Sequence, residues 1–276
     1  MSVASSIQEY DSAAPRSSFF DELRELWRYR DLLGLMVRHS IQTRYKRSAL
    51  GVFWTLLNPL MNMAVFTVAF SSLFKSTLPH YSVYVLCGLI AWNFFTQTTQ
   101  FAMTSVVWGG ALLKRVYLPR TIFGVAAIGN GLVNLLLSLV PLLVIMLVIG
   151  HPIYPTWWLV PLAVLLLAMF SLGVGLFLSA LAVTFVDVVD MYQILVQAWF
   201  FLSAVMYPKQ ILPANLVWYL NLNPIYNLLT LFRTPIYQGL VPGPNTIAAA
   251  VLSAVVALLV GWWTFTRRAD QIAYRI

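Results

Sequence analysis

The chain has 276 residues, of which 60% are hydrophobic and only 9% are charged, and its formal net charge is +8. Soluble domains usually carry about 25% charged residues, and the mean hydropathy here is +0.79, so the composition excludes a water-soluble globular protein. It predicts an all-α integral membrane protein instead, because the bilayer is the solvent that suits so much apolar surface.

The first 50 residues are predicted to form a cytoplasmic N-terminal segment. Residues 1–20 contain no apolar core of the kind that a signal peptide needs, so the first internal span is expected to drive insertion. Within residues 17–47, apolar side chains recur every four positions between basic ones, which predicts one or two amphipathic helices in the headgroup layer. Such a helix is either a topology anchor alone or an anchor that also contacts a partner or an anionic lipid head.

Residues 51–265 are predicted to form a transmembrane domain with six spans, because six apolar runs of about 20 residues follow one another. The runs cover approximately 52–74, 81–107, 120–149, 156–183, 191–207 and 246–265. The segment 208–240 contains repeated prolines and is too broken to span, yet it is too apolar for an aqueous loop. We expect re-entrant helices there, since such backbone is tolerated where it packs against protein or lines a cavity.

Basic residues set the expected orientation, because Lys and Arg near spans favour the cytoplasmic side. Fourteen of the 17 lie before the first span, between the second and third spans, or in the tail at 266–276, leaving only Lys75, Lys209 and Arg233 on the other side. Both termini are therefore expected in the cytoplasm. This topology accounts for the positive charge, so nucleic acid is not expected as a partner.

No pattern of catalytic residues stands out. The chain lacks a GxxxxGK[ST] phosphate loop, an HExxH motif and a GxSxG motif. His39, His80 and His151 have no second ligand-type residue at metal spacing, so no metal site is predicted. Asp187 and Asp190 are paired carboxylates without a neighbouring histidine. The sequence indicates a path through a membrane and contains no visible energy source, which is why we do not expect an enzyme.

Four blocks of sequence resemble the permease subunits of type-2 ABC exporters of the polysaccharide group, which serve O-antigen, capsule and teichoic acid export. The blocks are YKRSALGVFWTLLNPLMNMAVFTVAFSSLFK at 45–75, LLKRVYLPR at 112–120, SLGVGLFLSALAVTFVDVVDM at 171–191 and NPIYNLLTLFRTPIYQG at 223–239. They are spread over nearly all of the chain after residue 20. One position departs from the family, which commonly has Arg before the Asp in the turn after the fourth span, where this chain has Val186.

The resemblance implies a homodimer in the bacterial inner membrane, with two copies of a separate ABC ATPase beneath it. ATP and Mg would bind that ATPase, so no cofactor is expected on this chain. The implied substrate is a glycan on a polyprenyl pyrophosphate carrier, surrounded by membrane lipids. The interfacial helix and the cytoplasmic turns would couple ATP hydrolysis to transport, with these candidate residues: Arg28, Arg38, Lys114, Arg115, Asp187 and Asp190.

Three further groups of residues are candidates for contact with such a substrate. Basic side chains bind phosphate, so we expect the headgroup to enter near Arg44, Lys46 and Arg47. Aromatic faces suit sugar rings, although Trp and Tyr also collect at membrane interfaces; the candidates to line the path are Trp92, Phe94, Phe95, Phe101 and Trp199. Near the exit, Arg233 either snorkels to outer headgroups or makes a structural or substrate contact.

Three functions other than polysaccharide export would each require particular sequence features. The nearest is an ABC permease for a smaller lipid or drug, which the sequence distinguishes poorly. A membrane-embedded transferase or phosphatase would need a cluster of polar catalytic residues, and none is found. A secondary transporter would predict internal repeats and buried acids at mid-membrane, whereas the spans contain almost no ionisable groups.

Overall fold

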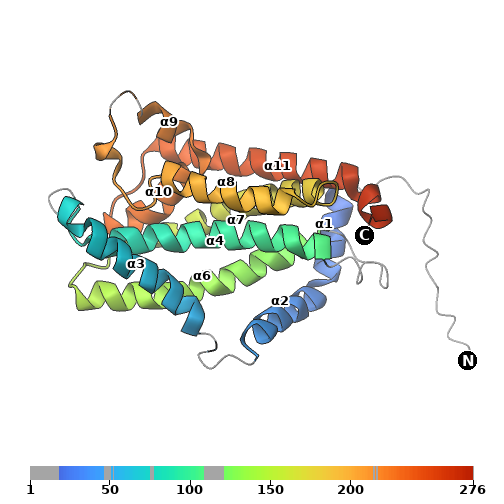
Figure 1. Cartoon of the computed structure of the whole chain (residues 1–276), viewed down its shortest axis with the longest axis horizontal. Helices are drawn as coiled ribbons and strands as arrows, with labels where there is room; N and C mark the ends of the chain where they lie inside the picture. The colour runs from blue at the N-terminus through green and yellow to red at the C-terminus, as the bar shows by residue number, and fades with distance from the viewer. Residues whose placement is uncertain are drawn as a thin grey trace, which may run out of the picture.

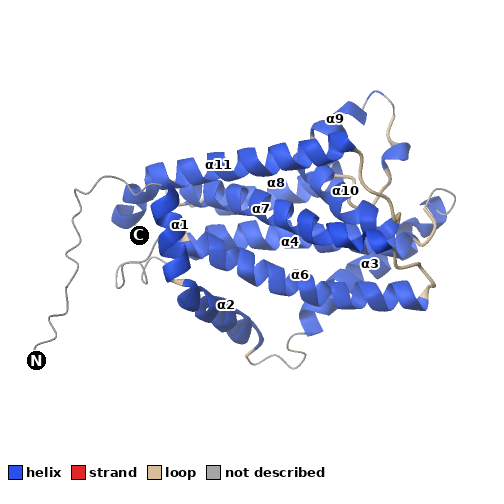
Figure 2. Ribbon diagram, turned by 180° about the vertical axis from the view of Figure 1, so that it is seen from behind, coloured by secondary structure: helices blue, strands red, loops and turns tan. Residues whose placement is uncertain are grey.

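The computed structural model describes residues 19–46, 51, 53–74, 78–108, 121–213, 215 and 217–275, and every regular element within these ranges is helical (Figure 2). The elements are α1 (Phe19–Arg28), α2 (Arg30–Tyr45), α3 (Phe53–Phe74), α4 (Tyr81–Trp108), α6 (Ile122–Val148), η1 (Pro155–Leu159), α7 (Val160–Ala182), α8 (Val188–Leu202), η2 (Lys209–Ile211), α9 (Val217–Leu222), α10 (Pro224–Tyr237) and α11 (Pro244–Arg275).

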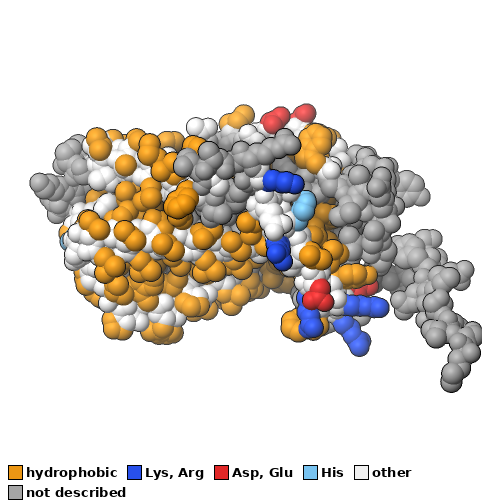
Figure 3. Space-filling model, turned by 90° about the horizontal axis from the view of Figure 1, so that it is seen from below, with side chains coloured by type: hydrophobic (Ala, Val, Ile, Leu, Met, Phe, Trp, Pro, Cys, Tyr) orange, Lys and Arg blue, Asp and Glu red, His pale blue; other side chains and the backbone are white. Residues whose placement is uncertain are grey.

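Helices α3, α4, α6, α7, α8 and α11 run between the two ends of one elongated bundle (Figure 1). At one end lie α1, α2 and the C-terminal part of α11, and we call this the basic end. At the other end, which we call the loop end, lie η1, η2, α9 and α10. In Figure 3, Lys and Arg side chains gather near one end of the visible face, while hydrophobic side chains cover most of the rest that is described.

The described helices confirm an all-α integral membrane protein. Three stretches are long and apolar enough to cross a bilayer: Ile122–Val148, Pro155–Ala182 and Pro244–Arg268. Two shorter apolar helices, Leu56–Phe70 and Val188–Leu202, accompany them. Helix α4 has 28 residues and carries polar side chains along one face; at about 1.5 Å per residue it is roughly 42 Å long. The six helices of the bundle fall on the six apolar runs, and the number that spans the membrane stays a prediction.

Two predicted ends differ from the structure. Helix α8 ends at Leu202 instead of near residue 207, because the next five residues form turns and Ala204 adopts a positive φ of 47°. Polar side chains from later in the chain bind the carbonyl of Leu202: Tyr219 Oη donates at 2.8 Å and Asn223 Nδ2 at 3.2 Å. Helix α11 continues to Arg275, whereas the last span was expected to end near residue 265.

The N-terminal stretch forms two helices, α1 and α2, which meet at Tyr29. On α1, Leu26 is buried in a hydrophobic cluster with Val106 of α4, Phe123 of α6 and Phe265 of α11. One apolar residue of α1 therefore belongs to the same packed cluster as residues of three bundle helices. A displacement of α1 would be transmitted to all of them, since packed interiors transmit strain.

Helix α10 is buried at the loop end, where it packs against α4, α7 and α11. Asn223 caps its N-terminus by accepting a hydrogen bond from the Ile225 amide at 3.2 Å, and Pro224 occupies the first helical position, where proline is favoured. The proline-rich segment 208–240 thus contains short helices, of which α10 is packed against protein while η2 and most of α9 are not buried, and re-entrant helices stay a prediction. Their depth in the bilayer stays a prediction.

Arg233 of α10 fastens the turn after α8 to α4. Its side chain is only 7% exposed. Nη2 donates to the carbonyl of Val205 at 2.6 Å, Nη1 donates to that of Ala204 at 3.4 Å, and the guanidinium lies 3.9 Å from the ring centroid of Tyr84. A Cβ at Gly88 would collide with Nη2, so glycine there leaves room for the guanidinium. These described contacts are structural, since a buried charge needs hydrogen bonds and can gain from an aromatic face.

Helices α7 and α11 touch through their backbones. A Cβ added at Gly261 would collide with the carbonyl of Gly173, and a Cβ added at Gly173 would collide with the backbone of Ala257. Small residues allow this close approach, which supplies van der Waals packing where lipid removes the hydrophobic driving force between helices.

Gly261→Ala should lower the thermal stability of the detergent-solubilised protein, because the new methyl group meets backbone that cannot rotate away; overpacking of this kind costs about 1–3 kcal/mol. Gly34→Ala is the matched control, since a Cβ at this helical glycine has nothing within 4 Å. Equal unfolding midpoints for the two variants would contradict the described α7–α11 contact.

Arg233→Gln should loosen the turn at Ala204 and Val205 from α4 without preventing insertion. Cys87 is the only cysteine and is buried beside Gly88, so it reports this opening. We expect maleimide to label Cys87 about tenfold faster in the variant, as a loss of roughly 1.4 kcal/mol in local stability would give. Arg28→Gln, a change at an exposed arginine, is the control; labelling at the wild-type rate in Arg233→Gln would argue against the described role of Arg233.

Candidate functional site

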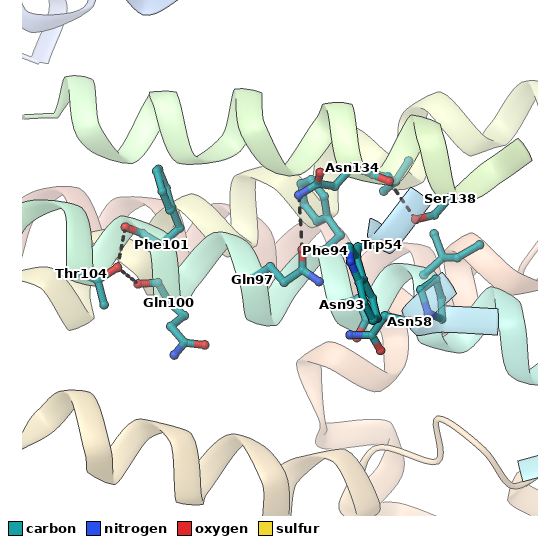
Figure 4. Close-up of a pocket in the computed structure, with 13 residues that line it drawn as sticks. Trp54, Asn58, Asn93, Phe94, Gln97, Gln100, Phe101, Thr104, Asn134 and Ser138 are labelled. Carbon is teal, nitrogen blue, oxygen red and sulfur yellow. Dashed lines mark hydrogen bonds between the residues drawn. The ribbon is translucent and has the colours of Figure 1, made fainter. Parts of the chain in front are cut away.

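A polar groove opens between α3, α4 and α6, and we call it the amide groove (Figure 4). Its cavity volume is about 550 Å³. The lining residues are Trp54, Asn58 and Pro59 of α3, then Ile90, Asn93, Phe94, Gln97, Gln100, Phe101 and Thr104 of α4, then Asn134, Leu135 and Ser138 of α6. Most of its polar atoms belong to uncharged amides and hydroxyls, and no charged residue of the described chain lines it.

Helix α4 supplies the longest side of the groove. Asn93, Gln97, Gln100 and Thr104 follow one another at intervals of four, three and four residues, which places them on one face of a helix. The rest of α4 is largely apolar and buried in the bundle core. The sequence therefore builds a polar stripe into an otherwise apolar helix.

Helices α3 and α6 complete the groove with shorter stripes. Trp54 and Asn58 are four residues apart on α3, and Asn134 and Ser138 are four apart on α6, as Figure 4 shows. Pro59 lies inside α3 and has no amide hydrogen, so it cannot donate the usual helical bond to the carbonyl four residues before it. This proline removes one backbone hydrogen-bond donor from α3 near the groove.

Part of the polar lining is hydrogen-bonded within the protein, and part remains free. Asn134 Nδ2 donates to Gln97 Oε1 at 3.3 Å, and Ser138 Oγ donates to the Asn134 carbonyl at 2.8 Å. The side chains of Asn93 and Gln100, by contrast, make no hydrogen bond with any other residue that the structure describes. Their amides are therefore available to a ligand.

The chemistry of the groove suits a neutral ligand with many hydroxyl groups. Each free amide offers two donors and an acceptor, which matches hydroxyls that both donate and accept. Trp54, Phe94 and Phe101 add apolar ring surface beside the amides. Amides facing hydrocarbon without partners would cost free energy, so water, a polar ligand or another chain is expected to meet them. The groove contains no acid or base for catalysis.

The predicted aromatic candidates divide into two groups. Phe94 and Phe101 line the amide groove, and their place beside a path stays a prediction. Trp92 and Phe95 are buried, as Phe94 largely is, and Trp199 packs edge-on against Phe95 with ring centroids 5.6 Å apart. Trp92, Phe95 and Trp199 do not line the groove. The amides were missed, although the spacing from Asn93 to Thr104 was readable in the sequence.

The predicted coupling residues that are described lie at the basic end. Arg28 and Arg38 are exposed on α1 and α2, and Asp187 and Asp190 are exposed at the start of α8. They are thus accessible to a partner beneath the bundle.

The remaining predicted positions are described only in part. Lys114 and Arg115 lie outside the described residues, as does Arg47. Arg44 belongs to α2, but its side chain is not described, and Lys46 is exposed just after that helix. The roles of all these residues stay predictions.

Two histidines that are far apart in the sequence meet at the loop end. The rings of His80 and His151 are edge-on with centroids 5.3 Å apart, and His151 also stacks on Tyr237 at 5.6 Å. Burial lowers the pKa of His151 below its ordinary value, and the neighbouring His80 lowers it further. Within the described residues, no three potential metal ligands come together, so the pair is an aromatic contact.

The sequence is similar over most of its length to bacterial export proteins. A family model described as ABC-2 type transporter matches residues 31–237. An "O-antigen export system permease protein RfbA" of Myxococcus xanthus is 30% identical over 258 residues, covering 92% of this chain and 98% of the relative. A protein of the same name from Klebsiella pneumoniae is 22% identical, covering 86% and 92%. The "Polysialic acid transport protein KpsM" of Escherichia coli is 24% identical, covering 84% and 92%. The chain belongs to the ABC-2 type transporter family.

Proposed function

We propose that the chain is the transmembrane subunit of an ATP-driven exporter, which moves a polysaccharide linked to a lipid pyrophosphate from the cytoplasm across the bacterial inner membrane. The observation that carries this proposal is the amide groove, an uncharged site of amides and aromatic rings in an apolar bundle. The names of the relatives support the same substrate class, since they refer to export of O-antigen and transport of polysialic acid.

In this proposal, six helices cross the membrane and the basic end faces the cytoplasm. The positive-inside preference supports this orientation, because the N-terminal segment and the C-terminal tail together hold most of the Lys and Arg. The loop end then faces outward, with α9 and α10 beside the exit. A glycan entering from the basic end would pass the amide groove before it reaches the loop end.

The energy would come from a separate ABC ATPase in two copies, which would carry ATP and Mg. Its docking surface would include the exposed side of α1, where Trp27 is 72% exposed and the Arg30 guanidinium lies 5.6 Å from the Trp27 ring centroid. Asp187 and Asp190 would join this surface. The hydrophobic cluster that Leu26 shares with residues of α4, α6 and α11 gives such a partner a route to move the bundle.

The chain would act as a homodimer with the path between two copies. Helix α8 supports this arrangement, because its exposed face combines the amides of Gln193 and Gln197 with the apolar side chains of Ile194 and Leu195. Amides that face hydrocarbon are costly. A second copy, or a wet path beside it, would provide the hydrogen bonds that lipid cannot.

A tagged full-length chain, coexpressed with its neighbouring genes and extracted in mild detergent, should copurify with an ABC-type ATPase. Native mass spectrometry should give two permease and two ATPase copies. Recovery of the chain alone in several detergents would contradict ATP-driven export, because no ATPase would then be bound. A passive channel or secondary transporter would have to be considered instead.

Asn93→Leu combined with Gln100→Leu should reduce export, because the two changes remove the free amides that we assign to the glycan. Two lost hydrogen bonds at roughly 0.5–1.5 kcal/mol each predict about a tenfold fall in surface polysaccharide at limiting expression. The measurement is surface polysaccharide in cells that lack the native gene and express each variant.

Gln210→Leu is the control for this experiment, since this exposed amide in η2 lies outside the groove. Copurification of the ATPase shows that each variant still assembles. A wild-type amount of surface polysaccharide in cells with the double variant would contradict the role that we assign to the groove. Drug sensitivity without loss of polysaccharide in cells lacking the gene would favour the permease for a smaller lipid or drug.

A further inference from the structure

A second groove lies between α2 and α6 near the basic end, and we call it the α2–α6 groove. Its cavity volume is about 480 Å³, and its walls are almost entirely apolar. The apolar walls are formed by Leu33, Val37 and Ile41 of α2 and by Val125, Ala126 and Gly129 of α6. An apolar cavity of this kind accommodates a hydrocarbon chain.

Contacts between the two helices fix the shape of this groove. Asn130 Nδ2 of α6 donates to Ser40 Oγ of α2 at 3.3 Å. A Cβ at Gly129 would lie 2.8 Å from Cγ2 of Val37, so α2 rests directly on α6 at that point. One turn away, Gly34 also lines the groove, and a Cβ there would have nothing within 4 Å. The two contacts lie side by side, and the open space extends from them toward Gly34.

The groove has one cationic side chain among its lining residues. Arg38 and Gln42 are four residues apart on α2, line the groove and are exposed. Arg38 makes no ion pair with any residue that the structure describes, whereas Arg30 approaches Asp31 at 3.9 Å. An unpaired guanidinium beside an amide donor is suited to bind a phosphate.

The α2–α6 groove and the amide groove are neighbours on α6. Ala126, Asn130, Asn134 and Ser138 are spaced by four residues, so they follow one another along a single face of that helix. Ala126 lines the first groove and Asn134 lines the second. The two residues are about 12 Å apart along the axis at roughly 1.5 Å per residue. One ligand can therefore contact both grooves.

We infer that the α2–α6 groove binds the lipid end of a lipid that carries sugars on a phosphate, with its chain against Val37 and Val125, its phosphate at Arg38, and its sugars in the amide groove. This inference rests on the proposed function and assigns the carrier lipid a site. The occupant is the glycolipid rather than an ordinary phospholipid, because its sugars would supply the hydroxyl groups that match the free amides of the neighbouring amide groove. Arg38, which the family resemblance assigned to coupling, contacts substrate instead.

The test measures lipid binding to the full-length permease–ATPase complex by native mass spectrometry. The probes are a polyprenyl-pyrophosphate-linked disaccharide, polyprenyl phosphate, uncharged polyprenol and phosphatidylglycerol. The wild type should bind them in this order of decreasing affinity. Gly34→Phe and Val125→Phe fill the groove from opposite walls and should each weaken the three polyprenyl probes about tenfold. Arg38→Gln should weaken the two phosphate-bearing polyprenyl probes similarly and leave polyprenol unchanged.

Two matched variants control for general effects. Leu35→Phe adds the same bulk to an exposed position of α2 that does not line the groove, and Arg24→Gln removes an exposed charge from α1. Both should bind all probes as the wild type does. Wild-type affinity in both groove-filling variants would overturn the inference, and so would equal binding of phosphatidylglycerol and the linked disaccharide by the wild type. Surface polysaccharide in cells lacking the gene is scored separately, because its persistence would refute the proposed function and not the lipid site.

Discussion

The structure depends on one constraint, which is that hydrocarbon offers no hydrogen bonds, so each polar group within an apolar bundle must find its partner in the protein, in water or in a ligand. The two terminal nitrogens of Arg233 donate to backbone carbonyls and the guanidinium lies over the face of Tyr84, while Nε has no hydrogen-bond partner among the described residues. Asn223 satisfies the constraint by capping α10 and binding the end of α8. The free amides of Asn93 and Gln100 find no partner within the described chain, and they line a groove of about 550 Å³ with room for a ligand or water to provide one.

The same constraint explains how far the sequence predicted the fold. Apolar runs located the helices of the bundle well, because a helix that crosses the hydrocarbon layer needs a run of apolar residues of matching length, and such a run can be found in the sequence. The end of α8 was predicted less well, since Leu202 is capped by Tyr219 and Asn223, which lie about 20 residues later. No local pattern before residue 207 contains that information. The division of the N-terminal stretch at Tyr29 was similarly left open by its periodicity.

The candidate site was only partly predictable for a related reason. All five aromatic candidates follow from the rule that aromatic rings suit sugars, but only Phe94 and Phe101 line the groove, whereas Trp92 and Phe95 pack in the core away from it. The face of α4 that turns toward α3 and α6 is determined by tertiary packing, which single-residue preferences do not reveal. The spacing of Asn93, Gln97, Gln100 and Thr104 did carry the information, because amides on one face of an apolar helix are difficult to explain by packing alone. Hydropathy averaged over a span conceals such a stripe.

A neutral groove also has a kinetic advantage for moving a long polymer. A conduction path must bind well enough to admit its substrate and weakly enough, at several sites, to release it. Charge-assisted hydrogen bonds are roughly twice as strong as neutral ones, so a row of arginines would hold an anionic glycan in place. The polar stripe of α4 instead offers several weak sites along about 16 Å, at roughly 1.5 Å per residue from Asn93 to Thr104. In the proposed function, a glycan would exchange one amide for the next as it advances. The single cation of the two grooves, Arg38, lies nearer the basic end, where a stronger hold on a phosphate would retain the carrier while the sugars move past the amides.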